Sequence, residues 1–175
     1  MTQTRPKVGD ATDLEQGIAR VLAPNPSPMT YWGTNTYLFG HDSVVVIDPG
    51  PADPIHLKAL MSAIAGRPVS HILVTHSHLD HSPLARVLAQ ATGAPVLAFG
   101  DRTTGRSDIM AHLAASGMMG GGEGVDDTFA PDETLQDGDD ITGDGWTLRA
   151  HHTPGHFGNH MCFTSGKVGF SGDLV

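Results

Sequence analysis

The sequence THSHLDHS, residues 75–82, places three histidines and one aspartate within six positions. Eight of the 11 histidines of the chain fall in two short stretches, 71–81 and 151–160. A lone histidine is usually a polar surface residue, but four ligand-type side chains at H-x-H-x-D-H spacing indicate a metal site. They directly follow an apolar run, residues 70–75, that is typical of a short buried strand. The motif is therefore expected on a loop at the end of a strand.

The spacing within the motif predicts how its side chains are oriented. Residues two apart in extended chain point to the same side, so His76 and His78 can reach one ion. Asp80 and His81 are adjacent and cannot share that orientation, which leaves them available to a second ion close by. Neutral imidazole and carboxylate are ligands that zinc, iron and manganese accept.

Composition limits the class of protein. A length of 175 residues suits one domain, residues 1–175, with 39% hydrophobic and 17% charged residues as in globular proteins. The net charge of −9 disfavours electrostatic capture of nucleic acid and favours a small-molecule substrate. The polar start lacks a signal-peptide pattern, no apolar run reaches membrane length, and the single Cys162 excludes an internal disulfide. Together these features favour a cytoplasmic protein without a membrane partner.

Two amphipathic segments with helix punctuation lie among the expected strands. Residues 53–66 and 82–93 read as helices, with Asp53 and Ser82 as N-caps and a proline next in each case. Residues 101–131 contain the glycine-rich stretch GMMGGGEG (117–124) and predict a loop or lid with a short helix in DIMAHLAA. Strands are expected at 17–23, 34–40, 43–50, 70–75 and 94–100, and again near 133–135, 146–153, 160–164 and 168–172.

This order of elements predicts an α+β fold, an αββα sandwich of two packed mixed β-sheets with outer helices. The two convincing helices belong to the first sheet, so the second sheet is expected to have a bare outer face. The chain ends on Leu174 and Val175, two apolar residues directly after an expected strand. We therefore expect the natural polypeptide to continue, so that the second half of the fold is incomplete and lacks its C-terminal part. A homodimer through the bare sheet stays open.

Four motifs resemble the metallo-β-lactamase superfamily, in that family's order. THSHLDHS resembles its H-x-H-x-D-H signature, and VVVIDPG (44–50) resembles the strand and Asp-containing turn before it. HHTPGH (151–156) resembles the T-P-G-H element, and FSGD (170–173) resembles the strand that ends in a bridging aspartate. The resemblance covers roughly residues 17–175.

The resemblance implies a binuclear centre, with two zinc ions expected and iron or manganese as alternatives. The family adds a last histidine to the second metal from a downstream loop, and the sequence ends before any such residue. The second metal is therefore expected to be held more weakly or completed by water. By resemblance, the first metal is held by His76, His78 and His156, and the second by Asp80, His81 and Asp173.

The implied activity is hydrolysis of an ester, thioester, lactone, amide or phosphodiester by a metal-bound hydroxide. Asp80 is the expected catalytic residue, because it would hold the second metal and orient the nucleophile or take its proton. Two alternatives stay open. One is an oxidoreductase that resembles the persulfide dioxygenases, with a single iron held by two histidines and an aspartate. The other is a metal-binding fragment without turnover.

The remaining polar residues have plainer expectations. Asp48 is expected as a hydrogen-bond acceptor behind the ligands or as a turn residue. His160 is either a substrate contact or a surface residue. His56 is expected on the surface, and Cys162 in the core.

Overall fold

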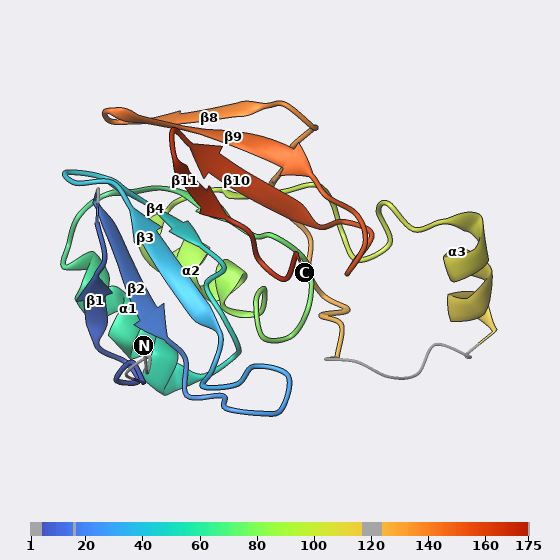
Figure 1. The fold of residues 1–175 in the computed structure, drawn as a ribbon, viewed down its shortest axis with the longest axis horizontal. Helices are drawn as coiled ribbons and strands as arrows, with labels where there is room; N and C mark the ends of the chain where they lie inside the picture. The colour runs from blue at the N-terminus through green and yellow to red at the C-terminus, as the bar shows by residue number, and fades with distance from the viewer. Residues whose placement is uncertain (1–4, 16, 117–123, 175) are drawn as a thin grey trace.

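The computed structural model describes residues 5–15, 17–116 and 124–174, which form two facing β-sheets (Figure 1). The first sheet has the strand order β1-β2-β3-β4-β5-β6-β7 and the second has the order β11-β10-β9-β8. The strands of the first sheet are β1 (Ala11–Asp13), β2 (Ile18–Leu22), β3 (Asn35–Phe39), β4 (Val44–Ile47), β5 (Val69–Leu73), β6 (Val96–Ala98) and β7 (Glu133–Thr134). Those of the second are β8 (Asp140–Gly143), β9 (Trp146–His152), β10 (Met161–Ser165) and β11 (Val168–Phe170).

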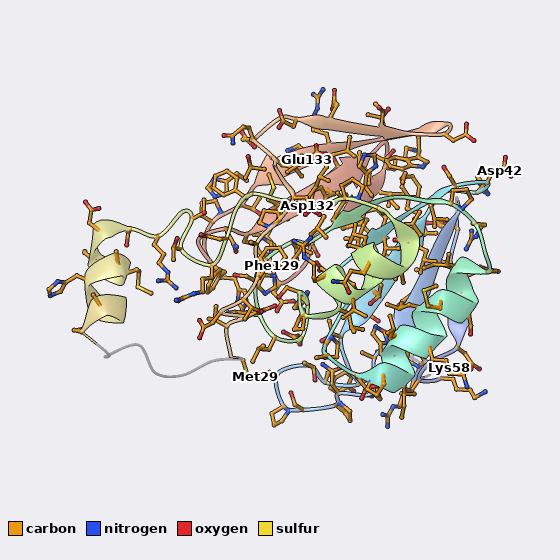
Figure 2. All side chains as sticks on the ribbon, turned by 180° about the vertical axis from the view of Figure 1, so that it is seen from behind. Met29, Asp42, Lys58, Phe129, Asp132 and Glu133 are labelled. Atoms are coloured by element: carbon orange, nitrogen blue, oxygen red, sulfur yellow. The ribbon has the colours of Figure 1, made fainter. Side chains whose placement is uncertain are left out.

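The first sheet is mixed, as expected. Its strands β1 to β4 pair antiparallel, and β4 to β7 pair parallel. Parallel neighbours need a crossover connection, and α1 (Pro54–Ile64) lies in the one from β4 to β5 and α2 (Leu84–Thr92) in the one from β5 to β6. Seen from behind, both helices lie in front of this sheet (Figure 2). The described strands of the second sheet pair antiparallel throughout, so that sheet is not mixed.

Strand alternation divides the core into two layers. Successive side chains of a strand point to opposite faces, so neighbours in β4 enter different clusters. Val46 packs with Leu60 of α1 in the layer between sheet and helices. Ile47 packs with Leu148 and Phe163 of the second sheet in the layer between the sheets. All five side chains are essentially inaccessible to solvent, and burial stabilises each by about 1.5–3 kcal/mol.

The outer face of the second sheet is bare in the described residues. Along β9, Thr147 and Arg149 are exposed while Trp146, Leu148 and Ala150 are buried, which is the alternation of a sheet with one face in contact with solvent. The expected short helix is present as α3 (Asp108–Ala115), and both views show it clear of the sheets (Figures 1 and 2). Of the glycine-rich stretch, residues 117–123 lie outside the described residues.

The ends of α1 largely follow the sequence prediction, whereas the start of α2 does not. Asp53 Oδ1 accepts hydrogen bonds from the backbone N–H groups of Ile55 and His56, which caps α1. The Ser82 hydroxyl instead lies 3.2 Å from the His78 carbonyl oxygen and 3.0 Å from Asp126 Oδ2, and these two acceptors share its single hydrogen. The prediction of Ser82 as a side-chain cap was therefore wrong. No described helix is both long and apolar enough to cross a membrane.

Candidate metal centre

The candidate site lies where strand ends of the two sheets meet. The carboxyl ends of the parallel strands β4 and β5 lead into Asp48 and into the loop 74–83. The loop between β9 and β10 carries His156, and the residues after β11 carry Asp173. The Met161 N–H donates to the Thr75 carbonyl at 2.8 Å, which joins β10 to the loop after β5. Segments distant in sequence are thereby brought to one point.

Three histidines, which we call the histidine trio, form the first half of the site. His76 Nε2 and His78 Nδ1 are 3.0 Å apart, and His156 Nε2 is 3.0 Å from the same His78 Nδ1. His76 is fully buried and His78 nearly so, while His156 is partly exposed at the rim. The three nitrogen atoms all lie within 4.8 Å of one another. The histidine trio is therefore His76, His78 and His156.

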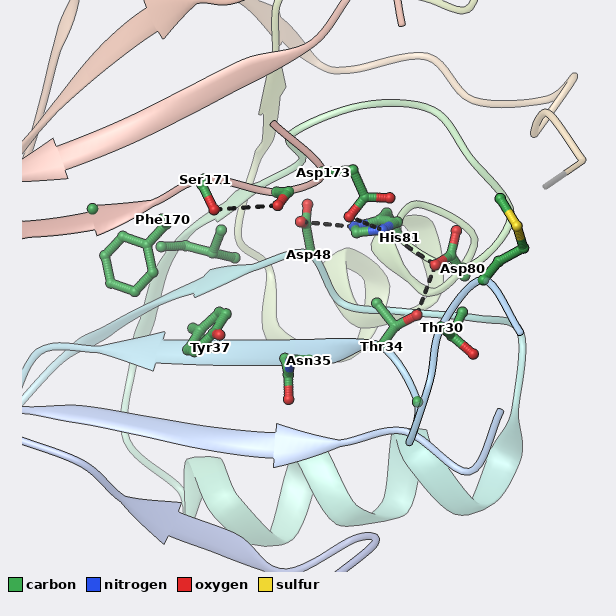
Figure 3. A pocket seen from close by; sticks show the side chains of 15 residues that line it. Thr30, Thr34, Asn35, Tyr37, Asp48, Asp80, His81, Phe170, Ser171 and Asp173 are labelled. Carbon is green, nitrogen blue, oxygen red and sulfur yellow. Dashed lines mark hydrogen bonds and ion pairs between the residues drawn. The ribbon is translucent and has the colours of Figure 1, made fainter. Parts of the chain in front are cut away.

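Two aspartates and one histidine, which we call the carboxylate group, form the second half (Figure 3). His81 Nε2 lies 3.2 Å from Asp80 Oδ2 and 3.5 Å from Asp173 Oδ1. The other oxygen of Asp173 is 3.5 Å from His156 Nε2 and 3.9 Å from His76 Nε2. Asp173 thus stands between the two halves. The carboxylate group is therefore Asp80, His81 and Asp173.

Asp48 determines which ring nitrogen each neighbouring histidine presents. Its carboxylate accepts the Thr75 hydroxyl at 2.8 Å, and since that hydroxyl has one hydrogen, Thr75 must accept from His76 Nδ1 at 3.0 Å. Asp48 also accepts from His81 Nδ1 at 2.8 Å. Both histidines therefore turn Nε2 towards the site, as metal-ligating histidines with a carboxylate behind them do. The expectation of Asp48 as a hydrogen-bond acceptor behind these residues is confirmed.

Two of the three trio histidines, His76 and His78, are neutral imidazoles. Burial lowers the pKa of His76 far below its ordinary value, and the surrounding imidazoles lower it further. Burial also lowers the pKa of His78 to about 4, with His156 acting in the same direction. At neutral pH both rings are uncharged and have a nitrogen lone pair available.

The carboxylate group has the opposite electrostatics. Burial alone would lower the pKa of His81, but the charges and hydrogen bonds of Asp48, Asp173 and Asp80 outweigh it and raise that pKa well above its usual value. The hydrogen bond from His81 in turn lowers the pKa of Asp173. Burial would raise the pKa of Asp80, yet its contacts with His81 and Thr34 lower it on balance. This half is a cation held among anions.

The donor set fits divalent metal ions. A single hydrogen on His78 Nδ1 cannot serve both of its 3.0 Å contacts, whereas a cation attracts all three lone pairs of the trio. His76, His81 and Asp173 form a second set of three donor atoms within 4.8 Å, now with a carboxylate. Asp80 belongs to neither three-residue set found in the described residues, and it joins the site through His81.

A cavity opens beside the carboxylate group (Figure 3). Its volume is about 210 Å³, and its wall includes Asp80, His81 and Asp173. Met29 and Thr30 from the loop between β2 and β3 line its other side. A substrate that enters here would meet the carboxylate group directly.

The structure brings all six sequence-predicted site residues together and corrects two other expectations. His160 is fully buried, with Nδ1 2.8 Å from the Thr153 hydroxyl, so its surface interpretation was wrong. His56 is also fully buried and lies 2.9 Å from the Thr36 hydroxyl, so its surface assignment was wrong. Cys162 lies in the core, as expected.

Several polar residues around the site were not anticipated. Thr34 donates to Asp80 Oδ2 at 2.7 Å, and Thr75 connects Asp48 with His76. Asn159 is fully buried, and its amide nitrogen lies 3.2 Å from the hydroxyl of Ser77, the residue between His76 and His78. The contacts of Thr34 with Asp80, of Thr75 with Asp48 and of Asn159 with Ser77 join residues far apart in the chain, so no local sequence pattern predicts them.

Comparisons with known proteins agree with the geometry. The sequence profile of the Metallo-beta-lactamase superfamily matches residues 29–175. The lactamase-like protein nscB of Neosartorya fischeri is 32% identical over 98% of this chain and 47% of its own length. The atrochrysone carboxyl ACP thioesterase of Aspergillus terreus is 30% identical over 97% of this chain and 47% of its own length.

A solved structure shows the same fold. A beta-lactamase domain protein from Burkholderia ambifaria matches with a TM-score of 0.69 at 22% identity, over 94% of this chain and 53% of that chain. The chain therefore spans about half the length of the proteins it matches. At this identity, the structural likeness concerns the fold alone.

Proposed function

Since the chain belongs to the metallo-beta-lactamase superfamily, we propose that it is a metal-dependent hydrolase with two divalent ions, zinc in the first instance. In this proposal the histidine trio holds one ion. The carboxylate group, Asp80, His81 and Asp173, holds the second, and the Asp173 carboxylate stands between the two.

One observation carries the proposal: nitrogen atoms of the trio converge although they come from segments that are distant in the sequence. His156 Nε2 and His78 Nδ1 are 3.0 Å apart although 78 positions separate them in the sequence. The His76 and His78 rings are uncharged, and the hydrogen bond to Thr75 turns His76 Nε2 inward. An arrangement that costs desolvation of several imidazoles is typical of a site built for a cation.

The protein's own groups would divide the work of hydrolysis. When bound, divalent ions lower the pKa of a coordinated water and polarise a substrate carbonyl oxygen. Asp80 is the proposed catalytic residue, because its carboxylate lies at the cavity wall with Oδ1 buried and without a partner among the described residues. A carboxylate at this wall can orient a water molecule and take its proton. Asp48 keeps the rings of His76 and His81 in place during this step.

Among the substrate classes that the motifs allow, we propose a thioester with an apolar acyl group. A relative from Aspergillus terreus is named as an acyl-carrier-protein thioesterase. The loop between β2 and β3 carries an apolar side chain at the cavity, because Met29 lines it and is 66% exposed. The net charge of −9 opposes the alternative of a nucleic-acid substrate.

One observation favours a second candidate, an oxidoreductase with a single iron. His76, His81 and Asp173 form a set of two imidazoles and one carboxylate, which is the ligand type of mononuclear non-haem iron centres. This candidate requires one iron per chain and consumption of oxygen. A cytoplasmic location and a homodimer also remain predictions from the sequence.

Metal analysis followed by a substrate panel tests the proposal. We expect zinc near two per chain and turnover of thioesters above lactones, β-lactams and phosphodiesters. Asp80→Asn should abolish most of that turnover while the exposed histidine variant His112→Asn retains it, since His112 lies on α3 away from the site. If the protein contains about one iron per chain and consumes oxygen, the hydrolase proposal is contradicted and the oxidoreductase is supported.

A further inference from the structure

One oxygen of the Asp80 carboxylate is hydrogen-bonded, and the other has no partner among the described residues. Oδ2 accepts the Thr34 hydroxyl at 2.7 Å and lies 3.2 Å from His81 Nε2. Oδ1 is buried and has no partner among the described residues. Asp80 is only 5% exposed, so solvent does not hold the carboxylate in this orientation. Thr34 makes the shorter of the two contacts that distinguish Oδ2 from Oδ1.

The direction of the hydrogen bonds around Thr34 follows from the chemistry of Asn25. The Thr34 backbone N–H lies 2.9 Å from Asn25 Oδ1, and because an N–H only donates, the amide oxygen must face it. The amide nitrogen of Asn25 then donates to Thr34 Oγ1 at 3.1 Å. The hydroxyl accepts from Asn25, so its single hydrogen is left for Asp80.

The loop between β2 and β3 holds Asn25 in this position. Thr30 Oγ1 donates to the Asn25 carbonyl at 2.5 Å, and Ala23 N–H donates to the Thr34 carbonyl at 2.9 Å, which closes the loop at its base. Gly33 has a φ of +133°, and a Cβ there would lie 2.2 Å from the Ala23 carbonyl oxygen. The close approach of the two loop ends therefore requires glycine at that position.

From these contacts we propose that Asn25 and Thr34 form a positioning relay that fixes the Asp80 carboxylate for the second ion. The inference rests on the proposed function and deepens it. The relay runs in one direction, from the Asn25 amide to the Thr34 hydroxyl and on to Asp80 Oδ2. Neither Asn25 nor Thr34 is a catalytic residue, because each acts through Asp80.

Thr34→Val and Thr34→Ser separate the hydroxyl from the shape of the side chain. Valine keeps the shape and removes the hydrogen bond, whereas serine keeps the hydroxyl. Crystal structures of the metal-free proteins should show the 3.2 Å contact between Asp80 Oδ2 and His81 Nε2 retained in the serine variant and lost in the valine variant. In zinc titrations with a competing chelator, Thr34→Val should weaken one binding step by about 10–100-fold and spare the other, as outer hydrogen-bond partners of ligands typically do. Thr34→Ser should keep both.

Two further variants sharpen the test. Asn25→Asp keeps the acceptor for the Thr34 N–H but replaces the amide donor with a second carboxylate oxygen. The hydrogen of the Thr34 hydroxyl is then shared between two carboxylates. The zinc-binding step that Thr34→Val weakens should therefore also weaken in Asn25→Asp, but by less. Thr92→Val removes a hydroxyl that donates to the Leu88 carbonyl at the end of α2, and it should leave both zinc steps unchanged.

The outcomes that overturn the relay differ from those that overturn the proposed function. Equal loss in Thr34→Val and Thr34→Ser would assign the effect to packing, and an unmoved Asp80 in Thr34→Val would assign no role to the hydroxyl. Unchanged Asp80 geometry and zinc binding in Asn25→Asp would remove Asn25 from the relay. If the parent protein binds no zinc, the proposed function fails, while the comparison of metal-free crystals still decides the relay.

Discussion

The histidine trio and the carboxylate group both take residues from the loop 74–83, but their electrostatics differ. Burial keeps two imidazoles of the trio neutral, because it lowers the pKa of His76 far below its usual value and that of His78 to about 4. The carboxylate group surrounds His81 with Asp48, Asp80 and Asp173, which raise the pKa of that histidine well above its usual value. A cation entering the trio meets free lone pairs, whereas a cation entering the carboxylate group must displace the proton of His81.

Because of this difference, we expect ion binding at the two halves to depend differently on pH. Lowered pKa values keep His76 and His78 unprotonated as the pH falls below 6.5, so their affinity for an ion should hold. The raised pKa of His81 means that its proton competes with an ion at neutral pH and below. Ion binding at the carboxylate group should therefore strengthen as the pH rises, and it should be lost first on acidification.

Removing the centre of the trio should have the largest effect. His78 Nδ1 makes both 3.0 Å contacts of the trio, so His78→Ala should lower hydrolysis and first-ion affinity by more than the upper figure of about 100-fold that is typical of outer partners. Chelator competition and thioester hydrolysis measure both quantities, with His112→Ala as the matched exposed histidine. If His78→Ala still binds two ions, the assignment of the first ion to the histidine trio is contradicted.

A buried histidine outside both halves tests whether burial explains the neutral state of His76 and His78. Burial lowers the pKa of His56 to about 4, below its value of about 6.5 in the unfolded chain. The unfolded state then binds the extra proton, so this group's contribution is present above pH 6.5 and falls by about 3 kcal/mol as the pH drops to 4.

His56→Gln should remove that part of the acid sensitivity. Chemical unfolding of the metal-free protein at pH 7 and at pH 4 gives the two free energies, and their difference should shrink in the variant. An unchanged difference would show that His56 is protonated in the folded state, and the same explanation for the trio would then lose its support.

Asp48 should give a smaller but more selective effect. Asp48→Asn weakens the partner of His81 Nδ1 and of the Thr75 hydroxyl without removing any proposed ligand. We expect a fall of about 10–100-fold in ion affinity, larger at the carboxylate group because His81 contacts Asp48 directly. Zinc titration resolves the two steps. Equal weakening of both would argue that Asp48 supports the loop as a whole and not His81 in particular.

Much of the site was predictable because its residues lie at strand ends in recognisable order. The i, i+2 spacing of His76 and His78 predicted a shared ion, and the structure places their facing nitrogens 3.0 Å apart. Thr34 was not predictable, since 46 positions separate it from Asp80 and the pairing of β2 with β3 brings it there.

The helices show which local signals were missed. His56 lies four residues before Leu60 and eight before Ile64, the period of a buried helix face, so its burial could have been predicted. Ser82 had the sequence of a cap, but the loop contact with the His78 carbonyl takes its hydroxyl. Propensity predicted the position of α2, and tertiary contacts decided its first turn.

Anomalous scattering from a zinc-loaded crystal tests the central claim most directly. The account predicts two peaks, one within bonding distance of His76 Nε2, His78 Nδ1 and His156 Nε2, and a second against the carboxylate group with Asp173 between them. A map without a peak among the trio, or with the ring of His156 turned away from His78, would contradict it.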